Sequence, residues 1–123
     1  MGDADLLQML ATETDRRAPS VIDGVKQLAE SGESDSTKVE ELRVEIHGLK
    51  GAALVVGQTR LADLAREVEV ALVQRTAPGT IPAELGERVA AATAAFREGS
   101  LAASKGEPEP PSVEAGLAAL AEG

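Results

Sequence analysis

Apolar residues recur at steps of three and four along four successive segments, and this spacing constrains the fold more than any other feature. The segments are residues 3–29, 37–56, 59–72 and 80–96. An α-helix brings residues three and four apart onto one face, so each segment is predicted to be an amphipathic helix with one buried stripe. The predicted core positions are Leu7, Leu10, Ala18, Val21, Val25, Leu28, Leu42, Ile46, Leu49, Ala53, Val56, Leu61, Leu64, Ala65, Val68, Leu72, Ile81, Leu85, Val89, Ala92 and Phe96.

Short breaks separate these segments. The breaks are the polar stretch 31–36, Gly57 and the Ala-Pro-Gly-Thr turn at 77–80. Thr80 is predicted to cap the last of the four helices, and Pro19 to kink the first or to start a second segment. Because short connections force consecutive helices to pack antiparallel, the predicted fold is all-α, an up-down antiparallel four-helix bundle.

The C-terminal part of the chain differs from the rest. We assign the bundle to residues 1–104 and a Pro/Glu-rich extended linker to residues 105–111. Residues 112–123 hold either a short fifth helix that docks back or the start of a further region. Val113, Leu117 and Leu120 would share one face of that helix.

Composition excludes several classes of function. The chain has no cysteine, which rules out disulfides and thiolate chemistry, and its net charge of −9 comes without a basic patch that nucleic-acid binding would need. No apolar stretch approaches the length of a membrane span, so we expect a cytoplasmic protein that binds no membrane. Carboxylates scattered along helices offer no convergent ligands, so no metal site is predicted.

His47 is the only histidine and follows the core position Ile46, which turns it about 100° away from the buried stripe. We therefore expect its side chain to be exposed. Arg43 precedes it by four residues, and Lys50 and Gly51 follow it by three and four, so all three lie on the same helix face.

These residue types suit phosphoryl chemistry. A neutral imidazole, with an unperturbed pKa of about 6.5, is a nucleophile that can accept a phosphoryl group, and the Lys50 ammonium could attract phosphate oxygens. A glycine inside a helix costs about 1 kcal/mol relative to alanine, so Gly51 indicates close approach by a partner. Val44 and Leu54 lie on the same side, either as an apolar docking patch or partly buried against a neighbouring helix. Taken singly, however, an exposed histidine on an amphipathic helix is usually just solvated.

The run His-Gly-Leu-Lys-Gly-Ala-Ala at residues 47–53 resembles the signature of the histidine-containing phosphotransfer (HPt) domain family. In that family a His, an apolar residue, Lys, Gly and small residues follow in that order on one helix. The resemblance covers roughly residues 3–100. Further matching positions are Gly57, Leu61, Leu64, Ala65 and Glu69.

The resemblance implies a phosphorelay protein of two-component signalling that carries a phosphoryl group on His47. The implied partners are a histidine kinase catalytic domain and the aspartate of a response-regulator receiver domain. No cofactor is expected on this chain, and Mg²⁺ would sit on the receiver. The chain contains no asparagine and no Gly-rich nucleotide loop, so ATP must be bound elsewhere.

In related domains, including the phosphoacceptor domain of chemotaxis-type kinases, an acid or amide on the next helix hydrogen-bonds the ring nitrogen that does not take phosphate. Glu69 stands at the matching position and would fix the tautomer that leaves Nε2 free. The chemotaxis-type domain often has a second histidine three residues earlier, where this chain has Arg66. Arg66 could instead contact phosphate or a partner's acidic rim.

Three interpretations remain open at this stage. The chain could be a free-standing relay protein or the N-terminal phosphoacceptor domain of a larger histidine kinase. It could also be a helical adaptor bundle without phosphoryl chemistry. Acid-labile, base-stable phosphate on His47 would exclude the adaptor.

Overall fold

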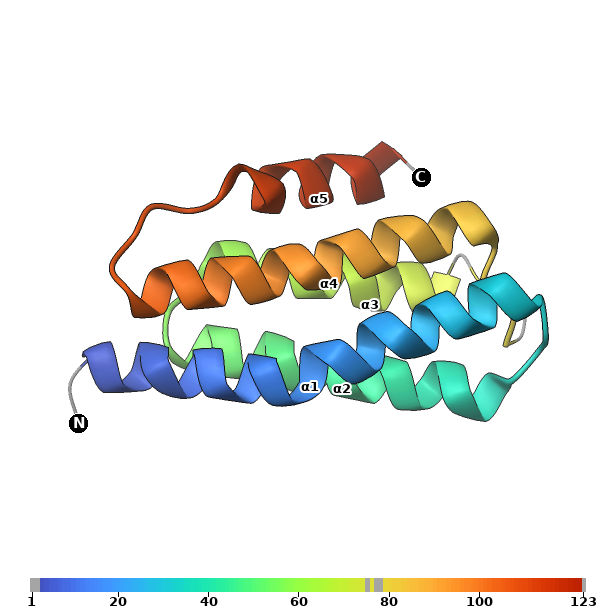
Figure 1. The fold of residues 1–123 in the computed structure, drawn as a ribbon, viewed down its shortest axis with the longest axis horizontal. Coiled ribbons are helices and arrows are strands. Elements are labelled where there is room, and N and C mark those ends of the chain that lie inside the picture. The colour runs from blue at the N-terminus through green and yellow to red at the C-terminus, as the bar shows by residue number, and fades with distance from the viewer. Residues whose placement is uncertain (1–2, 75, 77–78, 123) are drawn as a thin grey trace.

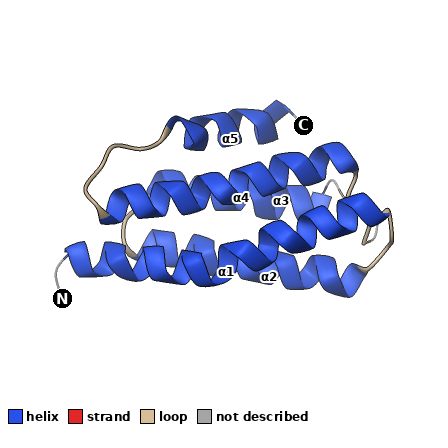
Figure 2. Cartoon of the chain, in the orientation of Figure 1, coloured by secondary structure: helices blue, strands red, loops and turns tan. Residues whose placement is uncertain are grey.

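The computed structural model describes residues 3–74, 76 and 79–122, and these residues form five α-helices and no β-strand. The helices are α1 (Asp3–Ser31), α2 (Ser36–Val55), α3 (Thr59–Gln74), α4 (Ala83–Ser104) and α5 (Pro111–Glu122). Figure 2 shows that loops join successive helices and that the loop leading from α4 to α5 is extended. The all-α prediction is confirmed.

Four of the helices form an up-down bundle. α1 and α3 each pack against both α2 and α4, so these helices close a ring around one core. Figure 1 shows each connection reversing the direction of the chain, which makes consecutive helices antiparallel. This is the arrangement expected when short loops join long amphipathic helices.

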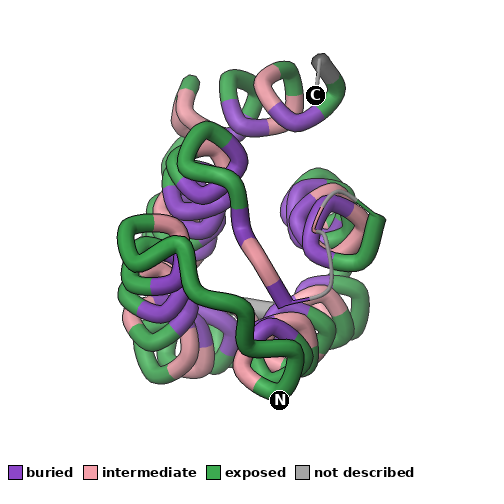
Figure 3. Tube along the Cα trace, turned by 90° about the vertical axis from the view of Figure 1, so that its right-hand side faces the viewer, coloured by how far each residue is buried: buried purple, intermediate pink, exposed green. Residues whose placement is uncertain are grey.

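The stripes predicted from the apolar spacing line the core of this bundle. Figure 3 shows the buried segments of the helices facing one another across its interior. Phe96, the single aromatic residue, is 2% exposed, whereas the predicted core positions Leu7 and Val56 are only partly buried. Burying one large apolar side chain contributes about 1.5–3 kcal/mol, so this interior is the main source of stability.

Pro19 lies inside α1. It does not start a second segment, because α1 runs unbroken from Asp3 to Ser31. Figure 1 shows the ribbon of α1 changing direction near its middle. A bend is the expected result where a proline removes one backbone donor from a helix.

The prediction that Thr80 caps the fourth helix is wrong. α4 begins at Ala83, with Pro82 at the N-cap and no side-chain capping hydrogen bond. The preset φ of proline suits the entry to a helix, so the chain turns helical only after this residue. Of the turn predicted at 77–80, residues 77 and 78 lie outside the described residues. Gly79 is described, and its carbonyl accepts a hydrogen bond from the Asp35 amide at 3.0 Å.

α5 docks back on the bundle, packing against both α3 and α4. Val113 and Leu120 are fully buried and Leu117 is partly buried. Gly99 of α4 and Gly116 of α5 allow close approach here: an added Cβ would lie 3.1 Å from Val113 Cγ2 at Gly99 and 3.1 Å from Leu64 Cδ1 at Gly116. The short fifth helix expected near the C-terminus is therefore present and docks on α3 and α4.

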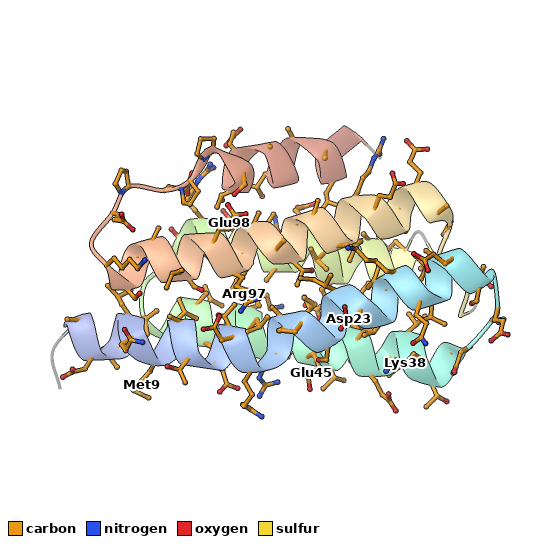
Figure 4. The ribbon with its side chains drawn as sticks, in the orientation of Figure 1. Met9, Asp23, Lys38, Glu45, Arg97 and Glu98 are labelled. Carbon is orange, nitrogen blue, oxygen red and sulfur yellow. The ribbon has the colours of Figure 1, made fainter. Side chains whose placement is uncertain are left out.

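Ion pairs link the helices at the surface. On the α1–α4 side, Arg97 donates from Nε to Asp15 at 2.8 Å, and Figure 4 shows Arg97 reaching from α4 toward α1. On the α5 side, Arg60 of α3 pairs with Glu109 at 3.2 Å and with Glu114. Such exposed pairs contribute at most about 1 kcal/mol each, so they orient helices more than they stabilise them.

Candidate functional site

The interface between α2 and α3 positions the side chains around His47. On α2, Ile46 is 2% exposed, and on α3, Val68 is 1% exposed. The next residue along each helix, His47 and Glu69 respectively, lies about 100° around from its buried neighbour, at the rim of the interface. Because α2 and α3 are antiparallel neighbours, the two rims meet and the two side chains come into contact.

Three nitrogen groups converge on the Glu69 carboxylate. His47 Nδ1 lies 3.0 Å from its Oε2. Arg43 Nη1 donates to the same oxygen at 2.8 Å, and Lys50 Nζ donates to Oε1 at 2.9 Å. The structure thus brings together four of the predicted site residues, three from one face of α2 and one from α3.

The ionisation state of Glu69 determines which ring nitrogen of His47 donates the hydrogen bond between them. Burial of the carboxyl works to raise its pKa, but the hydrogen bonds it accepts, led by that from Lys50, hold the pKa below its usual value. The carboxylate is therefore ionised at neutral pH and can only accept hydrogen bonds. It follows that His47 donates from Nδ1, so that Nε2 of the neutral ring keeps a free lone pair. With 60% of its side chain exposed, His47 offers this ring to a partner.

Lys50 is placed differently from the sequence expectation. The sequence predicts an ammonium available to phosphate, whereas the Lys50 ammonium is paired with Glu69 and its side chain is 24% exposed. An ammonium on a flexible four-carbon stem can exchange one anion for another at little cost. A role for Lys50 in contacting phosphate therefore stays a prediction.

The two glycines beside His47 have different surroundings. A Cβ added to Gly51 would meet nothing within 4 Å, so the surface next to the histidine is open there. A Cβ added to Gly48 would lie 2.6 Å from Nη1 of Arg17, whose guanidinium crosses over from α1. The sequence does not identify Arg17 as a neighbour of Gly48, although a glycine inside a helix is itself a signal of close approach.

Two apolar side chains flank the histidine on α2. Val44 is 50% exposed and Leu54 is 55% exposed, so neither is buried against a neighbouring helix. We use the name His47 face for the surface formed by Val44, His47, Gly51 and Leu54. Exposed aliphatic groups around a reactive side chain are typical of a docking surface.

Arg66 does not join the cluster. Its side chain is 62% exposed on α3, and it makes an ion pair with Glu67 at 3.5 Å. In the described part of the chain, no hydrogen bond or ion pair connects Arg66 with His47, Lys50 or Glu69. Its contact with phosphate or a partner stays a prediction.

The described residues contain neither a metal-binding cluster nor a membrane-spanning helix. Among them, no group of three or more histidine, cysteine, aspartate or glutamate side chains could hold a metal ion. None of the helices over residues 3–74 and 79–122 has the length and apolar character to cross a membrane.

Comparison with known proteins gives one match. Residues 5–122 match the family model described as "Hpt domain", which covers nearly the whole chain, including α5. No curated protein and no solved structure matches the chain.

Proposed function

Because the chain belongs to the Hpt domain family, whose members perform histidine phosphotransfer in two-component phosphorelays, we propose that His47 is its phosphoacceptor. The observation that carries this proposal is the hydrogen bond between His47 Nδ1 and the ionised Glu69. In the neutral ring this hydrogen bond keeps the proton on Nδ1 and leaves the Nε2 lone pair free, on a side chain that is largely exposed.

The proposed donor is the aspartyl phosphate of a receiver domain or the ATP-loaded catalytic domain of a histidine kinase. With a receiver, the Nε2 lone pair forms a bond to phosphorus while the bond from phosphorus to the aspartyl oxygen breaks. The electron pair leaves with the aspartate carboxylate. The Nδ1 proton stays in place, and the positive charge on the phosphorylated ring is stabilised by Glu69. Transfer onward to another receiver is the reverse of this step.

Charge near the transferred group supports the same proposal. Lys50 places a cation near His47 in a chain whose net charge is −9. Such a cation offsets the negative charge of a phosphoryl group in transit. We expect the carboxylates of the receiver domain to hold Mg²⁺.

The His47 face is the proposed docking surface for these partners. Val44 and Leu54 offer apolar contact, and Gly51 leaves room for a partner's active site to reach His47. Transfer demands that the reacting atoms come to about 3–3.5 Å, which a bulky side chain at position 51 would obstruct. A small, partly apolar surface suits a transient complex.

Incubation with a phosphorylated receiver, or with a histidine kinase and ATP, tests the proposal. The chain should take up one acid-labile, base-stable phosphoryl group, located on His47 by mass spectrometry. His47→Gln should take up none while keeping its helical circular dichroism. Labelling that persists in this variant, or no labelling of the wild-type chain by any kinase or receiver, would favour a helical adaptor instead.

A further inference from the structure

We propose that Arg43 is a positioning residue for phosphotransfer: it fixes the one oxygen of Glu69 that orients the His47 ring. This inference rests on the proposed function and assigns Arg43 a task other than binding a partner. Arg43 would act through Glu69 and would not touch the phosphoryl group.

The two oxygens of Glu69 have separate partners. Oε2 accepts from both His47 Nδ1 and Arg43 Nη1, at 3.0 and 2.8 Å. Oε1 accepts from Lys50 at 2.9 Å. Arg43 is therefore the side chain that shares an oxygen with the histidine, and Lys50 holds the other end of the carboxylate.

Arg43 is itself held in place from the opposite side. Its Nε and Nη2 donate to the two oxygens of Glu40 at 2.9 and 2.6 Å, a bidentate pair within α2. The rigid, planar guanidinium points its remaining Nη1 at Glu69. A lysine could not bridge two carboxylates in this way with the same geometry. The result is a chain of contacts from Glu40 through Arg43 and Glu69 to His47.

This chain matters most when Lys50 is drawn away. An arriving phosphoryl group competes with Glu69 for the Lys50 ammonium, and Oε1 then loses its donor. The carboxylate could rotate about its terminal torsion, which has a broad energy minimum. With Arg43 bound to Oε2, the oxygen facing Nδ1 stays in position through that exchange. The tautomer with a free Nε2 lone pair is thereby maintained during transfer.

The α1 pair of Arg16 and Glu13 offers a matched control. Arg16 makes the same i,i+3 bidentate contact, from Nε at 3.4 Å and from Nη2 at 2.5 Å. Arg16 has no contact with Glu69 among the interactions of the described residues. Arg43→Met and Arg16→Met therefore each remove a comparable surface pair while keeping an aliphatic stem.

Nitrogen NMR of the imidazole ring is the direct test, because His47 is the only histidine and the two neutral tautomers have distinct ring shifts. Arg43→Met should lower the fraction of the Nδ1–H tautomer and slow phosphorylation by about tenfold, the lower end of the effects of such outer partners. Arg16→Met should change neither. If Arg43 only stabilised the fold, both variants would have a lower melting temperature and the fraction of the Nδ1–H tautomer would not change.

An unchanged tautomer in Arg43→Met, or the same shift in Arg16→Met, would overturn the inference. The tautomer measurement needs no phosphoryl donor. Absence of phosphorylation in the wild-type chain would therefore count against the proposed function alone, and a constant tautomer would count against Arg43 alone.

Discussion

The guanidinium of Arg17 occupies the space that a side chain at Gly48 would need, 2.6 Å from Nη1 to the position of an added Cβ. Arg17 is held there by Glu13 and by Glu45, the latter at 3.5 Å. Gly48 therefore seats a side chain of α1 directly beside His47, whereas Gly51, three residues later, faces open solvent. In α2, Gly48 therefore makes room for Arg17, and Gly51 leaves the surface beside His47 open.

The first prediction compares these two glycines. Gly51→Ala should stabilise the protein by about 0.5–1 kcal/mol, because alanine is favoured in a helix and no atom stands in its way. Gly48→Ala should gain less than this, since it displaces Arg17 from two partly exposed ion pairs that contribute about 0.2–1 kcal/mol each. Urea unfolding of the two variants measures the difference. Equal stabilisation would show that Arg17 moves aside without cost.

The second prediction concerns access to His47. Gly51→Arg should block phosphotransfer from a receiver, because the new side chain would stand where the partner must approach. Gly51→Ala is the control and should retain transfer within about threefold, since a methyl group adds little bulk at an interface that tolerates small changes. Circular dichroism should be the same for both variants. Normal transfer by Gly51→Arg would place the docking surface elsewhere.

The third prediction follows from the lowered pKa of Glu69. A carboxyl whose folded pKa lies below its unfolded pKa stabilises the folded state above the unfolded value. That contribution is lost as pH falls through the folded value. Between about pH 7 and about pH 3, the wild-type chain should therefore lose more stability than Glu69→Gln does.

Urea unfolding at the two pH values measures this difference. Glu84→Gln is the matched control, because Glu84 is 76% exposed and its ion pair within the described part of the chain is with Arg88 on its own helix. The free energy of unfolding of Glu84→Gln should change with pH as that of the wild-type chain does. If Glu69→Gln does the same, the interactions of Glu69 contribute nothing to acid sensitivity.

The fourth prediction tests whether α5 is part of the cooperative fold. Leu120 is fully buried, so Leu120→Ala should destabilise the protein by about 2–5 kcal/mol through lost burial and a remaining cavity. Leu101→Ala, at a position 44% exposed on α4, should cost far less. Thermal unfolding should remain a single transition. A cost below about 1 kcal/mol for Leu120→Ala would mean that α5 unfolds separately.

The amino-acid sequence alone was sufficient to predict the helices and their buried faces. The step of three and four residues is a local property of the chain, so positions such as Ile46, Leu49, Leu64 and Val89 could be assigned to the core without any tertiary information. The exposure of His47 follows from the same geometry, because it is one residue away from a buried position. The predicted first residues of the helices were less accurate, as the wrongly predicted N-cap Thr80 shows. Adding or removing one or two residues at a helix end costs little free energy.

Only the tertiary structure could decide which side chains meet. The contacts of Glu69 with Arg43, His47 and Lys50 depend on the register between α2 and α3, which the packing of many core side chains sets together. For the same reason the sequence could not show that Arg17 reaches Gly48 from α1. It also could not decide between docking and release of α5, because that helix is too short to be stable alone and forms through its burial against α3 and α4.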